Sequence, residues 1–326
     1  MPRILSHEQM QSLLNMDDVI DTVENGFRSC TDQSFNTPVR LPLDVPDQNA
    51  VILYMPAYLS DPKTLGAKVV SVFPDNTMRD LPVIMGTYLL HDAESGELNA
   101  IMDATYMTGI RTAATSAVAT KYLANENVRT LGIVGAGVQA RYHVEALCCV
   151  RSFERILVYN RTIENGKVFV ERMAKSCPVP IELVNQTNDI AVTADVIATC
   201  TRSKEPVLDG RRLKSGVHIN AVGAFSPEMR ELDEYTILNS RVIVDTYGGA
   251  LTEAGDLLIP MNSGTLTRQD IHAELSEVVS GLKPNRQSND EITVFKSVGF
   301  AMEDAVTAHL AYQRALASGV GTDVEL

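Results

Sequence analysis

The stretch LGIVGAGVQARYH, residues 131–143, decides the fold of this chain. An apolar run that predicts a buried strand enters the turn GAGVQA, and a helical pattern follows, so the spacing GxGxxA lies in a strand–turn–helix context. The first glycine permits the tight bend, the second lets the backbone approach a pyrophosphate, and the alanine lets the helix pack on the strand. The helix N-terminus adds free N–H groups and a partial positive charge. We therefore expect a dinucleotide cofactor to be bound by Gly135, Gly137, Val138, Gln139 and Ala140, against the alternative of a glycine turn without a function.

The end of the next predicted strand, RILVYN, indicates which dinucleotide binds. Sites for NAD usually place Asp or Glu there, to accept hydrogen bonds from the ribose 2′-hydroxyl. Here the strand runs into Asn160, Arg161 and Thr162, which offer a cation and a hydroxyl donor to a 2′-phosphate and no carboxylate to repel it. A charge-assisted hydrogen bond contributes about 1.5–3 kcal/mol, which gives about tenfold preference or more. We expect NADPH, with NADH as the second choice; the alternative is that Arg161 is a solvated residue at a helix start.

Apolar runs and helical patterns continue to alternate downstream of this turn. IELV, DVIATCT, GVHINAVGA and RVIVDTY are expected strands, and alternation at this spacing predicts a parallel, doubly wound sheet. The segment from Thr37 to Met102 differs, because short β-rich runs are broken there by Pro, Asp, Asn and Gly. HDAESGELNAI predicts a hairpin with Ser95-Gly96 at its turn, so we expect an antiparallel sheet in this part. The fold class is therefore α/β.

Helical patterns flank the antiparallel part. Ser6 followed by Gln9 fits a capping box, which predicts a helix near the start of the chain. TGIRTAATSAVATKYLA, residues 108–124, predicts a helix of small residues that leads out of the first domain. TVFKSVGFAMEDAVTAHLAYQRAL, residues 293–316, predicts one long helix that returns to it. We expect the tail ASGVGTDVEL to be frayed.

Composition narrows the functional class. The chain has 326 residues, 45% of them apolar and 21% charged, which suits a globular protein of about two domains. Its 28 basic and 41 acidic residues leave a net charge of −13, which disfavours nucleic acid and anionic membranes as partners. No apolar stretch approaches the ~20 residues that span a bilayer, and the N-terminus does not resemble a signal peptide. Five scattered cysteines indicate reduced thiols, and the six histidines lack metal-ligand spacing, so we expect a cytoplasmic protein without a metal site.

Three cations stand out against this acidic background. Lys68 lies in the β segment LGAKVVSVFPDN, Arg40 lies in TPVRLPL, and Arg111 lies in a helix of small apolar residues without a neighbouring acid. Each of them alone can be explained as a surface cation with an apolar stem. Together they could hold a substrate carboxylate, because arginine offers a bidentate fork to that group.

The motifs in their order resemble the ornithine cyclodeaminase/μ-crystallin family over nearly the whole length. The residues that carry the resemblance are LGAKVVSVFPDN, TGIRTAATSAVATKYL, GIVGAGVQA, YNRTIEN, ADVIATCT, GVHINAVGAFSPEMREL, VDTYGGALTEAGDLL and TVFKSVGFAMEDAV. The resemblance implies a Rossmann doubly wound parallel sheet over residues 121–299. It also implies a discontinuous α+β domain, residues 1–120 with 300–326, which serves dimerisation and substrate binding in a homodimer.

The resemblance implies roles for individual residues as well. Arg40, Lys68 and Arg111 are expected to meet the substrate carboxylate, and Asn160, Arg161 and Thr162 match the 2′-phosphate site of the NADPH-binding ketimine-reductase branch. The other residues expected at the cofactor are Thr87, Arg111, Thr201, Val222 and Lys296. For Lys296 the alternative is a cation near a helix start, and Asp256 is expected to be a solvated charge.

One departure from the family pattern bears on the reaction. Cyclodeaminases of this family carry a catalytic aspartate shortly after the AVG turn, where this chain has Phe225. Phenylalanine cannot move a proton, so ornithine cyclisation with loss of ammonia is disfavoured. An apolar wall suits a cyclic imine, whose C=N bond is already formed. Ser226 matches the small polar residue of reductase-like members and is expected to contact the substrate.

These observations predict an NAD(P)H-dependent ketimine reductase. The expected substrate is a small imino acid, Δ1-pyrroline-2-carboxylate or Δ1-piperideine-2-carboxylate, with proline or pipecolate as the product. Lys68 or a bound water is the candidate proton donor. The enzymatic alternatives are an alanine dehydrogenase-type amino-acid dehydrogenase and the cyclodeaminase itself. A non-catalytic protein that binds NADPH and a small ligand is the alternative from another class.

Overall fold

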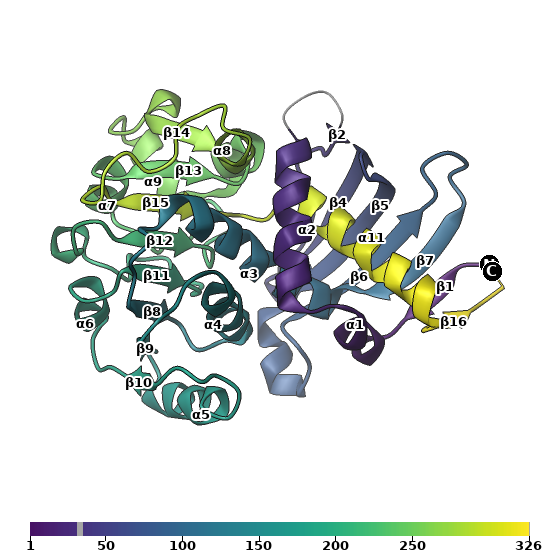
Figure 1. Cartoon of the computed structure of the whole chain (residues 1–326), viewed down its shortest axis with the longest axis horizontal. Coiled ribbons are helices and arrows are strands. Elements are labelled where there is room, and N and C mark those ends of the chain that lie inside the picture. Colours follow the sequence, from purple (N-terminus) through teal and green to yellow (C-terminus); the bar gives the residue numbers. More distant parts are fainter. Residues whose placement is uncertain (31–34, 326) are drawn as a thin grey trace. The chain divides into compact units, whose positions relative to one another are not determined.

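The computed structural model describes residues 1–30 and 35–325 of the chain. These residues form two compact units, Met1–Thr112 with Phe300–Leu326 and Ala113–Gly299. Each unit is built on a sheet of eight strands (Figure 1). Helix α3 (Ala104–Leu123) contains the boundary between the units.

The first unit holds a mixed sheet in the order β16-β1-β7-β6-β5-β4-β2, with β3 also paired to β4. The neighbours from β4 to β7 pair antiparallel, which confirms the prediction, and β1 adds a parallel pair with β7. The predicted hairpin joins β6 to β7, and Gly96 in its turn has φ +76°. Its strands are β1 (Arg3–Leu5), β2 (Phe35–Asn36), β3 (Leu41–Val45), β4 (Ala50–Ser60), β5 (Lys63–Val72), β6 (Ile84–His91), β7 (Leu98–Asp103) and β16 (Thr322–Asp323).

Helices from both ends of the chain pack in this unit. Its helices are α1 (His7–Leu13), α2 (Met16–Ser29) and α11 (Ala301–Ser318), with the 3-10 helices η1 (Pro46–Gln48) and η2 (Pro74–Arg79). The predicted capping box is present at α1, where Ser6 and the Gln9 side chain each accept the other's backbone N–H. Helix α11 packs against α2, β4 and β5, which confirms that the C-terminal helix returns to the first unit (Figure 1).

The second unit holds an all-parallel sheet in the order β10-β9-β8-β11-β12-β15-β13-β14. The chain starts at β8, moves outward to β9 and β10, and then returns to the other side of β8 to form β11. This reversal is the switch point of a doubly wound fold, which confirms the predicted fold class. Its strands are β8 (Thr130–Val134), β9 (Arg155–Tyr159), β10 (Ile181–Leu183), β11 (Val196–Thr199), β12 (His218–Ala221), β13 (Arg241–Val244), β14 (Ile271–Glu274) and β15 (Thr293–Lys296).

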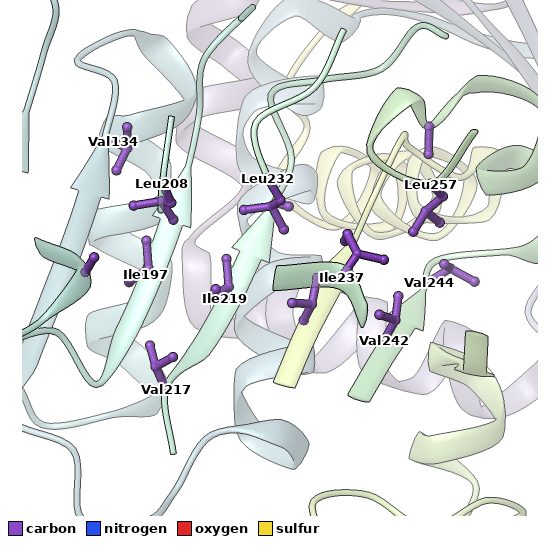
Figure 2. Packing of buried hydrophobic residues seen from close by; sticks show 14 of the residues in the cluster. Val134, Ile197, Leu208, Val217, Ile219, Leu232, Ile237, Val242, Val244 and Leu257 are labelled. Carbon is purple, nitrogen blue, oxygen red and sulfur yellow. The ribbon is translucent and has the colours of Figure 1, made fainter. Parts of the chain in front are cut away.

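Both faces of this sheet are covered, so its strands are apolar without alternation. The helices of the unit are α4 (Val138–Val150), α5 (Ile163–Met173), α6 (Thr187–Ala191), α7 (Glu234–Leu238), α8 (Tyr247–Glu253), α9 (Gly255–Asn262) and α10 (Leu275–Val279), with η3 (Gly210–Arg212) and η4 (Arg268–Asp270). Val134 and Ile197 point into the cluster that Figure 2 shows, together with Leu232 and Leu257 from the loop and helix above it. Ile133 belongs to the cluster on the opposite face. The two apolar layers fix the register of the strands, because a slip by one residue would exchange them.

Two predictions about the C-terminal part were wrong. Residues 293–296 form strand β15 between β12 and β13, and the helix begins only at Ala301. The run Thr-Val-Phe has the β-branched and aromatic side chains of a strand, and Gly299 at φ +97° ends the extended segment before the helix. The tail is also ordered where it pairs, because β16 adds to β1 and Asp323 accepts from Arg3 Nε at 2.8 Å.

The described residues contain no helix that is long and apolar enough to cross a membrane.

A leucine pair tests the packing of the second unit. Leu131 on β8 is 0% exposed and Leu282 is 66% exposed. We expect Leu131→Ala to lower the free energy of unfolding in urea by about 2–5 kcal/mol, because it removes buried methyl groups and leaves a cavity. The same substitution at Leu282 should change it by less than about 0.5 kcal/mol. Equal effects of the two substitutions would contradict the assignment of β8 to the core.

Candidate functional site

Four charged side chains meet in the interior of the first unit. Lys68 comes from β5, Arg111 from α3, and Glu303 and Asp304 from the first turn of α11. Lys68 Nζ lies 2.8 Å from Asp304 Oδ2, while Arg111 donates to Asp304 at 2.8 Å and to Glu303 at 2.5 Å. None of the four is more than 4% exposed. The acid that Arg111 lacks in its own helix is therefore supplied by α11.

The cluster changes the acidity of its members. Burial lowers the pKa of Lys68 to about 8, and the positive charge of Arg111 acts in the same direction against the attraction of Asp304. Burial and the charge of Asp304 raise the pKa of Tyr88. Tyr88 on β6 lies directly opposite Lys68 on β5. The hydroxyl groups of Tyr88 and Thr64 are buried without a hydrogen-bond partner among the described residues. A lysine with this pKa is largely protonated at neutral pH and yet can give up its proton, which is what a general acid requires.

The other two expected residues of the first unit are more exposed than this cluster. Arg40 precedes β3 and is partly exposed. Thr87 is exposed and neighbours Tyr88 on β6, so its side chain points to the opposite face of the sheet from Lys68.

The glycine-rich turn of the second unit has the form that a dinucleotide requires. Gly135 has φ +106°, and a Cβ there would lie 2.8 Å from the carbonyl oxygen of Cys200. At Gly137 a Cβ would meet no atom within 4 Å, so the backbone faces open space directly before α4. Ala140 is fully buried, whereas Val138 is 71% exposed. The buried Oε1 of Gln139 finds no hydrogen-bond partner among the described residues, as expected of a site that is completed by a ligand.

The end of β9 is tied to this turn. Asn160 Oδ1 accepts the N–H of Ala136 at 3.1 Å, and its Nδ2 donates to the carbonyl of Thr162 at 2.8 Å. Arg161 and Thr162 are exposed at the start of α5. The side chains of Arg161 and Thr162, which can bind a phosphate, therefore lie at the strand end where a doubly wound fold usually binds the ribose 2′-hydroxyl of a dinucleotide.

A buried polar network lies where β11 and β12 end. The carboxylate of Glu231 accepts hydrogen bonds from Thr199 at the end of β11, from Thr201 in the loop that follows, and from the N–H of Gly223 after β12. Asp256 accepts the N–H groups of Glu231 and Leu232 at 2.7 and 2.8 Å. Glu231 was not predicted as a functional residue, because no local pattern in the sequence distinguishes a buried glutamate from an exposed one.

This network corrects two expectations about charges. Asp256 is 1% exposed and not solvated, because it lies 2.9 Å from Lys296 Nζ. Lys296 ends β15, is fully buried and donates to the carbonyl of Ala224, so the helix-start alternative was wrong for it. Its charge is compensated inside the protein, which indicates a role in holding the loop after β12.

The loop after β12 carries the remaining expected residues. Val222 is 9% exposed and its N–H donates to Thr199. Phe225 packs, partly buried, on the apolar cluster of Figure 2, and Ser226 donates to Glu228 at 2.8 Å. No hydrogen bond within the loop depends on the nature of the side chain at position 225, since phenylalanine has no polar side-chain atom.

No group of three or more His, Cys, Asp or Glu that could hold a metal ion is found among residues 1–30 and 35–325.

The ornithine cyclodeaminase/mu-crystallin family model matches residues 1–319 of the chain. The chain belongs to this family. A Delta(1)-pyrroline-2-carboxylate reductase of Bacillus cereus is 38% identical over 323 residues, which are 99% of both chains. The solved structure of Thermococcus litoralis Delta(1)-pyrroline-2-carboxylate reductase in complex with NADH and L-proline is 43% identical, with a TM-score of 0.97 over 99% of this chain and 100% of that one. An archaeal alanine dehydrogenase dimer with bound NAD is 32% identical, with a TM-score of 0.94 over 99% of both chains.

The family assignment agrees with the two units described above. It was predicted from eight motifs, and it extends from the first strand of the mixed sheet to α11. The glycine-rich turn in its doubly wound sheet is of the kind that binds dinucleotides, and two relatives are seen with NADH and with NAD.

The charge cluster of the first unit can be tested through stability. Asp304→Asn should lower the free energy of unfolding by about 3–5 kcal/mol, because it leaves an uncompensated positive charge in the interior. Glu94→Gln is the matched control, since Glu94 pairs with Lys63 at the surface and is 72% exposed. The control should cost less than about 1 kcal/mol in the same urea titration. A cost for Asp304→Asn no larger than the control's would contradict the compensation described here.

Proposed function

We propose that the protein reduces a cyclic ketimine carboxylate, Δ1-pyrroline-2-carboxylate or Δ1-piperideine-2-carboxylate, to proline or pipecolate with NAD(P)H. The observation that carries the proposal is the state of Lys68. This lysine is buried beside Arg111, and the pKa of Lys68 is lowered to about 8. The similarity to pyrroline-2-carboxylate reductases over 99% of the chain supports the same reaction.

The reaction needs one hydride and one proton. The hydride, which the dinucleotide supplies when bound, reaches the imine carbon, and the C=N π electrons take a proton at the ring nitrogen. The ammonium of Lys68 is the proposed source of that proton, and Arg111 with Arg40 is proposed to hold the carboxylate. Asp304 keeps Lys68 protonated near neutral pH, because its negative charge opposes the effect of burial on the lysine pKa. Orientation by fixed cations also removes part of the entropic barrier.

The residue at position 225 supports reduction over cyclodeamination. Cyclodeamination of ornithine requires a base that moves protons between the amine, the imine and the attacking nitrogen, and a base contributes about 10²–10⁴-fold to such a step. Phe225 offers none, and Ser226 beside it is engaged with Glu228. A preformed imine needs only the proton that Lys68 can give.

A substrate panel tests the reaction. With Δ1-pyrroline-2-carboxylate the protein should oxidise NAD(P)H in steady state, whereas ornithine with the oxidised cofactor should release ammonia at no more than a trace rate. Turnover with pyruvate and ammonia that exceeds imine reduction would instead indicate an alanine dehydrogenase-type enzyme. Cofactor binding without turnover of any of these compounds would indicate a binding protein.

Lys68 gives this reaction a pH dependence. The general acid must be protonated, so the rate of imine reduction should fall as the pH rises through the lysine pKa of about 8. Lys68→Met should lower kcat by about 10²–10⁴-fold and remove this alkaline limb. Lys63→Met is the control, because Lys63 begins the same strand and is 68% exposed. An unchanged pH profile in Lys68→Met would exclude Lys68 as the acid.

We propose NADPH as the preferred cofactor within the NAD(P)H class. The exposed Arg161 and Thr162 at the end of β9, without a carboxylate beside them, support this choice. NADPH should give about tenfold higher kcat/KM than NADH, and Arg161→Ala should bring the ratio close to one. Arg172→Ala, on the exposed side of the same helix α5, should leave the ratio unchanged. Equal efficiency of both cofactors in the unmodified protein would reject NADPH preference.

We propose a homodimer as the working assembly. Leu41 and Leu43 on β3 are 66% and 53% exposed, and Tyr54, which pairs with Leu41 across β3 and β4, is 38% exposed. An apolar strip of this kind on a sheet is usually covered by a partner. The dimer of the related archaeal alanine dehydrogenase supports the same assembly here.

A further inference from the structure

Glu231 joins two loops that are separate in the sequence. It is fully buried between β12 and α7, and both of its carboxylate oxygens are used. Oε1 accepts from the N–H of Thr201 at 2.6 Å and from its hydroxyl at 2.8 Å. Oε2 accepts from the hydroxyl of Thr199 at 2.9 Å and from the N–H of Gly223 at 2.7 Å. One side chain thus holds the end of β11 and the loops that follow β11 and β12.

These loops are packed against the glycine-rich turn with no spare room. A Cβ at Gly223 would lie 2.0 Å from the carbonyl oxygen of Thr201, and a Cβ at Gly135 would lie 3.3 Å from the Thr201 methyl group. Thr201 therefore stands between the turn after β8 and the loop after β12. A shift of the Thr201 backbone would disturb the loop after β12, where only a glycine fits at position 223, and would move the Thr201 side chain that lies against the turn at Gly135.

Both oxygens of the Glu231 carboxylate act as acceptors. Burial, together with the charge of Asp256, raises the pKa of Glu231 above its usual value, and the nearby Lys296 opposes this shift, while each oxygen receives a backbone N–H that only an acceptor can satisfy. Asp256 fixes the backbone of Glu231 from the other side and pairs with Lys296. One lysine and two carboxylates of this network therefore hold two loops in position.

We propose that Glu231 is a positioning residue for the nicotinamide half of the dinucleotide. In a doubly wound sheet the turn after the first strand receives the pyrophosphate, and the strands beyond the switch point serve the second mononucleotide. Here those strands are β11 and β12, whose following loops Glu231 holds. The inference rests on the dinucleotide site of the proposed function and does not depend on which imine is reduced.

Glu231→Gln tests the proposal. It keeps the size of the side chain but replaces one carboxylate oxygen, which accepts a backbone N–H, with an NH₂ group that can only donate. NADPH and 2′-phospho-ADP-ribose, which lacks the nicotinamide, are titrated separately by calorimetry. The dissociation constant of NADPH should rise at least about tenfold, the loss expected for a hydrogen bond to a charged group. That of the fragment should change less than about twofold, since the glycine-rich turn and Arg161 keep their own contacts.

Asp195→Asn is the matched control. Asp195 also accepts two backbone N–H groups, those of Arg129 and Thr130, and pairs with Lys214, but it lies at the amino ends of β8 and β11. This variant should lose stability and keep the affinity for NADPH. If Glu231→Gln does not fold, Thr199→Val replaces it as the test, because this substitution removes one hydrogen bond to Glu231 from a residue of β11. The affinity for NADPH should then fall by about 2–10-fold, while the affinity for the fragment should not change.

The outcomes are distinct. Equal weakening of NADPH and the fragment, or no weakening of either, would overturn the positioning role. Failure of the unmodified protein to bind any dinucleotide would overturn this inference and the proposed function together. If the unmodified protein binds NADPH but reduces no imine, the proposed reaction fails while the titrations still decide the role of Glu231.

Discussion

The buried ion pairs that Asp304 makes with Lys68 and Arg111 are the constraint on which the first unit depends. The two residues of the Lys68 pair are 236 positions apart in the chain, so the pair requires α11 to return to the sheet of the N-terminal part. Glu303 completes the balance of two cations and two anions. Removing any one of the four would leave a charge without compensation in the interior, and the discontinuous unit follows from this requirement as much as from apolar packing.

The two units bury a lysine against an aspartate in different ways. In the first unit the charges cancel, and Lys68 stays close to the pH range in which it can exchange a proton. In the second unit Lys296 faces both Asp256 and Glu231, and its ammonium also donates to the carbonyl of Ala224. In the proposed reaction the first arrangement supplies a proton, whereas the second holds backbone loops in position.

Local patterns in the sequence were sufficient for much of the fold. The glycine-rich turn, the doubly wound sheet and the C-terminal helix were all predicted, because each has a signal within a short window. Strand β15 was missed, since a short apolar run fits a buried strand and a buried helix equally well. The partners of Arg111 and the roles of Glu231 and Asp256 were also missed, because a buried charge is recognised by its partner, and those partners lie far away in the sequence. What the sequence could not supply was therefore the pairing of charges.

The fixed backbone of the loop after β12 explains how the side chain at position 225 can vary without disturbing the fold. Gly223 is held through its N–H by Glu231, and Ala224 is held through its carbonyl by Lys296. Position 225 follows directly, yet its side chain contributes to none of these bonds. An aspartate there would add a base to the same scaffold, and phenylalanine adds an apolar surface that packs on the core cluster. Because the loop is positioned by Glu231, Asp256 and Lys296, the side chain at 225 can be polar or apolar while the backbone around it stays in place, which is what the proposed choice between a base and an apolar wall requires.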